Sequence, residues 1–270
     1  MLPEAKSQDL LYVVRGGEGT VSVFTFPKRK PVGALSNIPG AFGICSDTTG
    51  DVFVVAREND EIYEFAHGGT KPIATLDDFG NDANGCAVDP ASGNLAVAGG
   101  LKAGQGDANA AVYQHARGSP TLYKSSAPQF TFSTYDSQGN VFMGGEVLFE
   151  LPQGSNSFVQ ISVPGVREFA PSDIQWDGSY IALQGTTGSK RGPTTIYQIQ
   201  VSGSTGTIVK QVSLTSPRDK NPYRGAQFWI GDGTIVGPED TVRRVGLWRY
   251  PKGGRPFIRW RSKKENRLSR

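Results

Sequence analysis

Histidine and cysteine are the side chains that most often carry acid–base, nucleophilic or metal chemistry in proteins, and this chain has few of either. It contains two histidines, His67 and His115, and two cysteines, Cys45 and Cys86. With only two histidines, and both at positions that the repeat assigns below to structural roles, neither a Ser-His-Asp triad nor a histidine-rich zinc site is expected. No Cys-x-x-Cys pair occurs, so neither a redox motif nor a zinc knuckle is indicated. What these four residues can do depends on the elements that position them.

A repeated motif predicts those elements. An aspartate, a short turn with glycine and then an apolar strand occur at 47–56, 89–98, 136–145, 177–183 and, in a degenerate copy, 231–237. The first four aspartates are 42, 47 and 41 residues apart, and a four-stranded propeller blade needs about 40–50 residues. A third strand with an aromatic pair and a following turn occurs in six copies. The sequence therefore predicts an all-β fold, a six-bladed β-propeller of four-stranded antiparallel blades.

The two ends of the chain depart from this pattern. We expect a lead-in over residues 1–8, a single propeller domain over 9–260, and a basic, disordered tail over 261–270. The first unit begins at its second strand, near Asp9, so the first blade is expected to lack its innermost strand. Either this blade is open, or the true end of the chain has been lost.

The repeat also places the histidines and cysteines. Alignment of the third strands puts His67 in a column of exposed turn residues and His115 in a column of packing residues, so both are predicted to be structural. Cys45 and Cys86 lie on the innermost strands of neighbouring blades, one aligned position apart. Side chains alternate along a strand, so the two thiols point to opposite faces of their blades. On adjacent blades they therefore either face each other or point directly apart. A disulfide is possible if they face each other and the protein is exported, and the alternative is two buried free thiols.

The charge is unevenly distributed along the chain. Residues 1–216 carry a net charge of −6 and residues 217–270 one of +9. The arginines of the second part could form a stripe, but no nucleic-acid-binding motif surrounds them, so we do not expect nucleic acid as a partner. No run of 18 apolar residues exists, so no transmembrane helix is expected. The N-terminus also lacks the apolar stretch of a signal peptide.

Several segments are similar to one group of proteins. The sequence resembles bacterial NHL-like and SMP-30-like six-bladed propeller proteins in AFGICSDTTGDVFVV, EIYEFAHGGTKPIATL, GCAVDPASGNLAVAG, IQWDGSYIAL, AQFWIGDGTIVGP and VGLWRYPKGG. The resemblance covers about residues 9–260. It implies the propeller fold and, for many members, export to the cell envelope. The SMP-30-like members imply a metal-dependent lactonase activity.

Such lactonases hold their metal with a few Glu, Asp and Asn side chains at the mouth of the central channel, and oxygen ligands suit Ca²⁺ or Mg²⁺. By position, the candidates here are Glu58, Asp82, Asn84 and Asp173. Arg224 lies in another loop of the same face and is added as a binding candidate. The first and fifth units offer no clear acidic ligand, so the metal site is not complete at the level of sequence.

These observations lead to one interpretation and two alternatives. We predict a non-enzymatic binding or scaffold propeller of the cell envelope, monomeric and without cofactor, that recognises a protein or glycan on its loop-rich channel-mouth face. The first alternative is a metal-dependent hydrolase of the SMP-30 type that uses Ca²⁺ or Mg²⁺. The second is a decayed or truncated paralogue. The expected location is extracellular or periplasmic, with the cytoplasm as the alternative.

Overall fold

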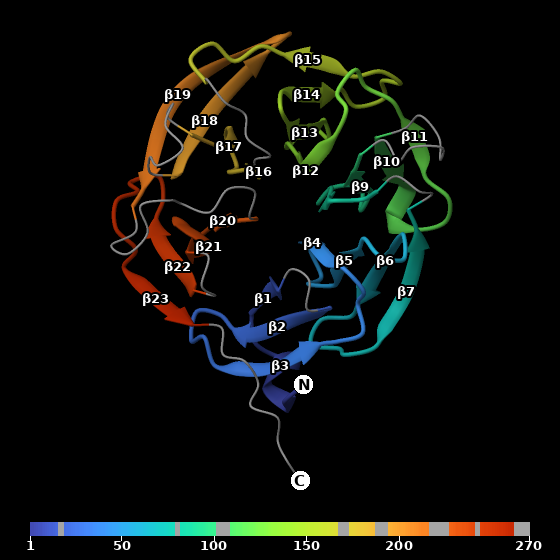
Figure 1. The fold of residues 1–270 in the computed structure, drawn as a ribbon, viewed down its shortest axis with the longest axis vertical. Helices are drawn as coiled ribbons and strands as arrows, with labels where there is room; N and C mark the ends of the chain where they lie inside the picture. Colours follow the sequence, from blue (N-terminus) through green and yellow to red (C-terminus); the bar gives the residue numbers. More distant parts are fainter. Residues whose placement is uncertain are drawn as a thin grey trace.

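The computed structural model describes residues 1–15, 19–78, 82–100, 109–166, 173–186, 194–215, 227–240 and 244–261. Six antiparallel sheets form a closed ring around a central axis, as Figure 1 shows. The first three blades contain β1 (Leu10–Arg15), β2 (Thr20–Thr25) and β3 (Pro31–Leu35); β4 (Ala41–Ser46), β5 (Val52–Ala56), β6 (Glu61–Phe65) and β7 (Pro72–Asp77); and β8 (Gly85–Val88), β9 (Leu95–Ala98), β10 (Ala110–Tyr113) and β11 (Thr121–Tyr123).

The last three blades have four strands each. They contain β12 (Phe130–Tyr135), β13 (Val141–Gly145), β14 (Leu148–Leu151) and β15 (Val159–Ile161); β16 (Ile174–Trp176), β17 (Ile181–Thr186), β18 (Thr194–Ser202) and β19 (Thr205–Leu214); and β20 (Trp229–Gly231), β21 (Thr234–Asp240), β22 (Arg244–Arg249) and β23 (Ile258–Arg261). Two short 3₁₀ segments, η1 (Pro3–Lys6) and η2 (Gln114–Ala116), complete the described elements. The six-bladed fold and the missing innermost strand of blade 1 are thus confirmed. No helix in the described residues is long and apolar enough to cross a membrane.

The repeated aspartate caps the turn between the first and second strands of a blade. In blade 2 the Asp47 carboxylate accepts hydrogen bonds from the backbone N–H groups of Thr49 and Asp51, both at 2.9 Å. Gly50 has a positive φ of 87°, which glycine adopts without strain. Equivalent bonds to backbone N–H groups occur at Asp89, Asp136 and Asp177. The motif therefore recurs in blades 2 to 5 because each of them has the same self-capped turn between its first and second strands.

The turn after the third strand is fastened to this cap. The Asp51 carboxylate accepts a hydrogen bond from the backbone N–H of His67, at 2.9 Å. The same bond recurs in blades 3 and 4, from His115 to Asn94 and from Gln153 to Asn140. His67 and His115 therefore occupy equivalent turn positions, and each imidazole contacts a backbone carbonyl, that of Gln8 and of Ser92 respectively.

The packing position predicted for His115 is filled by another residue. Tyr113 is fully buried and pairs with Leu95, as Phe65 pairs with Val52 in blade 2. His115 follows two residues later, in η2, and is exposed. The sequence alignment was wrong by two residues because η2 ends the strand earlier than the aromatic pattern suggested. The prediction that His115 is a packing residue is therefore corrected.

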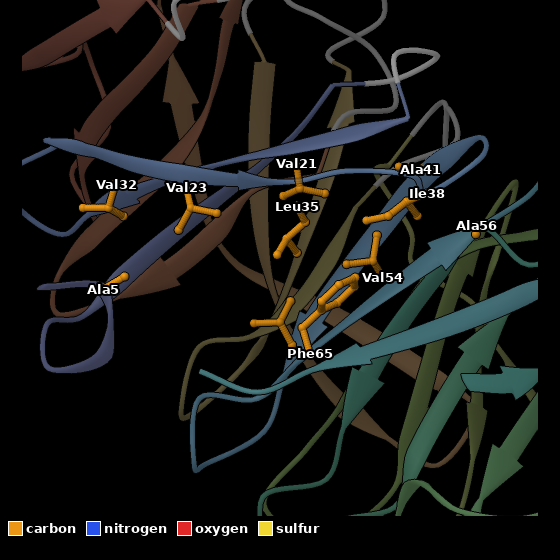
Figure 2. Close-up of a cluster of buried hydrophobic side chains, with 11 residues drawn as sticks. Ala5, Val21, Val23, Val32, Leu35, Ile38, Ala41, Val54, Ala56 and Phe65 are labelled. Atoms are coloured by element: carbon orange, nitrogen blue, oxygen red, sulfur yellow. The ribbon is translucent and has the colours of Figure 1, made fainter. Parts of the chain in front are cut away.

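Apolar side chains fill the spaces between neighbouring blades. Figure 2 shows the interface of blades 1 and 2, where residues of β2 and β3 pack on Val54, Ala56 and Phe65. Ala5 of η1 is also fully buried there, so the N-terminal lead-in is part of this core. The interface between blades 6 and 1 has three buried apolar residues, whereas the other five have seven to eleven. The seam between the first and last blades is therefore the least buried one in the described structure.

A glutamine side chain bridges the gap left by the missing strand. Gln227, just before β20 of blade 6, accepts a hydrogen bond from the Ile44 N–H at 3.1 Å and donates one to the Ile44 carbonyl at 2.5 Å. Its amide thus pairs with β4 of blade 2 as a peptide group of a neighbouring strand would. Gln175 makes the same two-point contact with Phe228 and Ile230 of the next blade. The Gln227 side chain therefore connects the innermost strands of blades 6 and 2, where blade 1 provides no innermost strand.

Replacing Gln227 by leucine should lower the free energy of unfolding by about 2 kcal/mol, because both backbone groups of Ile44 lose their partner. Urea unfolding followed by tryptophan fluorescence measures the change. The matched control is Gln160→Leu on the exposed outer strand β15, for which a change below about 0.5 kcal/mol is expected. Equal stability of the Gln227→Leu and wild-type proteins would show that the bridge does not hold the ring.

The two cysteines form a disulfide between blades 2 and 3. Cys45 on β4 and Cys86 on β8 have Cα atoms 5.6 Å apart, within the usual range for a disulfide. Of the two alternatives that the sequence left open, the facing arrangement is the one present. The bond joins two innermost strands, next to the central axis of the ring.

Candidate functional site

The channel-mouth face is formed by the loops between second and third strands and by those that enter the innermost strands. In blade 2 the first type of loop is residues 57–60, and its position is fixed by backbone bonds from Arg57 and Glu58 to the carbonyls of Gly40 and Pro39. Gly40 has a positive φ of 63°, and a Cβ there would lie 2.8 Å from Glu58. Both the turn and the close contact therefore require glycine, and together they set the place of Arg57.

Arg57 lies between a carboxylate and an aromatic ring. Its Nη2 is 3.4 Å from both carboxylate oxygens of Asp82, a residue of the loop that enters blade 3. Its guanidinium carbon lies 4.8 Å from the ring centroid of Phe42 on β4, within cation–π distance. The side chains of Arg57 and Asp82 are 34% and 39% exposed. The cation is thus held in place while part of its hydrogen-bonding edge faces solvent.

The aromatic ring below Arg57 belongs to a pair on the inner strands. Phe42 is stacked with Phe132 of blade 4 at 6.3 Å and 10°. Both residues lie at irregularities of the ladder, since the register shifts between Ala41 and Ile44 and between Phe130 and Phe132, and such bulges re-aim side chains. Blade 3 leaves room for the pair, because a Cβ on Gly85 would lie 2.7 Å from the Phe132 ring.

Two of the predicted ligands join blades instead of facing a common point. Asn84 and Asp173 each immediately precede an innermost strand and are almost fully buried. The Asn84 amide donates a hydrogen bond to the Phe130 carbonyl of blade 4 at 2.8 Å, and its Oδ1 has no hydrogen-bond partner among the residues that the structure describes. Asp173 accepts backbone hydrogen bonds from Ile174 and from Phe228 of blade 6. Burial raises the pKa of Asp173 well above its usual value, and the two N–H donors oppose this shift.

The structure describes two of the three remaining candidates. Glu58 is exposed beside Arg57, Asp82 bonds to Arg57, and Arg224 lies outside the described residues. In the part of the chain that the structure describes, no three His, Cys, Asp or Glu side chains are grouped so that they could hold a metal ion. Of the predicted ligands, only Asp82 contacts Arg57. Asn84 and Asp173 are separated from each other because they lie in different blade interfaces.

Sequence reasoning missed Arg57 and Phe42, the two residues that define this site. Both lie in segments that the repeat had identified, the loop 57–60 and the innermost strand 41–47. The sequence prediction considered oxygen ligands for a metal ion. An arginine beside an aromatic residue of the innermost strand indicates a binding site of another kind. An alignment of the second-to-third-strand loops could have singled out Arg57, but not its contact with Asp82, which lies 25 residues away.

Comparisons with known proteins identify the fold. The sequence matches no protein-family model and no curated protein. Among solved structures, virginiamycin B lyase from Staphylococcus aureus is similar with a TM-score of 0.63 and 12% identity, over 91% of this chain and 79% of that one. Hydrazine synthase from Kuenenia stuttgartiensis gives 0.61 and 14%, over 92% and 75%. A protein of unknown function from Bacteroides caccae gives 0.65 and 12%, over 94% and 93%. At these identities, the likeness establishes the propeller fold alone.

Proposed function

We propose that this protein is a binding propeller that recognises a protein or glycan ligand at the channel mouth, with Arg57 and Phe42 at the centre of the site. The observation that carries this proposal is the partly exposed guanidinium of Arg57, which contacts the Asp82 carboxylate and the ring of Phe42 on the innermost strand β4. A pre-positioned arginine beside an aromatic ring is typical of the residues that dominate binding energy. We also propose that the protein is related to the NHL-like and SMP-30-like propellers that its sequence resembles.

The Cys45–Cys86 disulfide supports a location outside the cytoplasm. Disulfides persist in oxidising compartments, such as the periplasm and the cell exterior, and are rare where thiols are kept reduced. We therefore propose that the protein acts in the extracellular space or the cell envelope. This location also fits a glycan or an envelope protein as the ligand.

The test is a binding screen of the folded protein against an array of purified glycans and candidate envelope proteins. Arg57→Ala should weaken binding of any ligand found by about tenfold, because it removes both the cation–π contact and the charged donor. The matched control is Lys71→Ala, which removes an exposed cation from the opposite face. Equal affinity of the wild-type and Arg57→Ala proteins for every ligand found would place recognition elsewhere.

A second experiment distinguishes the metal-dependent alternative from the binding propeller. Thermal unfolding is measured with EDTA and then with Ca²⁺ or Mg²⁺, since a cation that binds only the native state raises its stability. A saturable shift that is lost in Asp82→Asn would favour the hydrolase over the binding propeller. Binding of a ligand in EDTA, with Arg57 required, would favour the binding propeller.

A further inference from the structure

Two turns that lie far apart in the sequence belong to neighbouring blades and lie on the same face, opposite the channel mouth. Residues 26–30 connect β2 to β3 in blade 1, and residues 250–257 connect β22 to β23 in blade 6. All turns between third and fourth strands lie on this face, because neighbouring strands alternate in direction. The two blades are neighbours in the propeller (Figure 1). Two pairs of aromatic side chains join them: the ring centroids of Phe24 and Trp260 are 6.2 Å apart, and those of Phe26 and Trp229 are 5.6 Å apart.

The two turns have the same local structure. Each begins with an aromatic residue, a proline and a lysine, in FPKRKP and YPKGGRP. In each, a backbone N–H bonds back four residues, from Arg29 to Thr25 at 2.5 Å and from Gly253 to Arg249 at 2.7 Å. Lys28 and Lys252 therefore occupy equivalent positions on adjacent blades, and both are exposed.

These turns concentrate positive charge. The cationic side chains on or beside them are Lys28, Arg29, Lys30, Arg249, Lys252 and Arg255. Lys30 is paired with Glu4, whereas the structure records no carboxylate within ion-pair distance of Lys28, Lys252 or Arg255 in the residues that it describes. Arg249 lies 5.5 Å from the ring of Phe257, which is itself 47% exposed. The surface thus offers several cations with free donors and one exposed aromatic ring.

We propose that these two turns form a docking surface for an acidic polysaccharide. Charged groups spread over two adjacent turns fit a polyanion better than a single small anion. Arginine and lysine donors suit carboxylate or sulfate groups spaced along a chain. The disulfide favours an oxidising compartment, where acidic polysaccharides are an accessible class of polyanion. This surface is separate from the channel-mouth site, so either proposal can fail without the other.

The experiment measures binding of alginate, with neutral dextran as the uncharged probe, at about 50 and about 200 mM NaCl. We expect alginate to bind at low salt, to bind more weakly at high salt, and dextran not to bind. The double variant Lys28→Glu/Lys252→Glu should weaken alginate binding by at least about tenfold, because it reverses two contact charges. The matched control Lys124→Glu/Lys210→Glu reverses two exposed lysines of blades 3 and 5, outside the third-to-fourth-strand turns, and should retain the wild-type affinity. Thermal unfolding verifies that both variants are folded.

Three results would overturn the proposal. The first is the absence of alginate binding at low salt. The second is an equal loss of affinity in the control variant, which would show that only the net charge matters. The third is tighter binding of duplex DNA or of anionic phospholipid vesicles than of alginate, which would assign the surface to a different class of macromolecule.

Discussion

Replacing both cysteines by alanine is expected to lower the free energy of unfolding by about 4 kcal/mol. The bond between Cys45 and Cys86 closes a loop with a sequence separation of 41 residues. The loss of loop-closure entropy in the unfolded chain gives about 4 kcal/mol for a loop of this length. Alanine is the appropriate replacement because Cys86 is buried and serine would place a hydroxyl group in an apolar interface. Urea unfolding of the oxidised proteins measures the difference.

Reduction provides an independent check of the same bond. Dithiothreitol should lower the stability of the wild-type protein toward that of the Cys45→Ala/Cys86→Ala variant and leave the variant unchanged. Mass spectrometry of the non-reduced wild-type protein should detect no free thiol. Equal stability of the oxidised wild-type and variant proteins would mean that the disulfide does not support the fold, and free thiols would also remove the main support for an oxidising compartment.

Gly43→Ala is expected to lower the free energy of unfolding by about 3 kcal/mol, the upper part of the usual range for overpacking. A Cβ at this position would lie 2.2 Å from the carbonyl oxygen of Asn84 and 2.6 Å from the Cα of Gly85. Both contacts are with the backbone of the neighbouring blade, so no side chain can rotate away. The two inner strands would have to separate, and the interface of blades 2 and 3 would open.

The matched control for this prediction is Gly100→Ala. Among the described residues, its Cβ would have no neighbour closer than 3.6 Å, and its φ is not positive, so a change below about 0.5 kcal/mol is expected. Thermal and urea unfolding compare the two variants with the wild-type protein. If Gly43→Ala unfolds at the same urea concentration as Gly100→Ala, the close approach of β4 and β8 does not determine stability.

The sequence by itself determined the fold class, the number of blades and the incomplete first blade. These features depend on local chemistry that recurs, such as the self-capped turns at Asp47 and Asp136 and the alternating strands that follow them. The alternation also limited Cys45 and Cys86 to two arrangements. A local pattern of this kind is present in every copy of the repeat, so it can be recognised without any knowledge of long-range contacts.

Only the tertiary structure decided how the blades meet. It selected the disulfide, assigned Asn84 and Asp173 to blade interfaces, and placed Arg57 over Phe42 and beside Asp82. Except for the Arg57–Phe42 contact within blade 2, these contacts join residues on different blades. Their geometry depends on β-bulges and on glycines that allow close approach of the backbone. The closure through Gln227 likewise joins residues 183 positions apart. Hydrogen bonds and packing over such separations are not part of the repeated motif, so the periodicity of the sequence does not predict them.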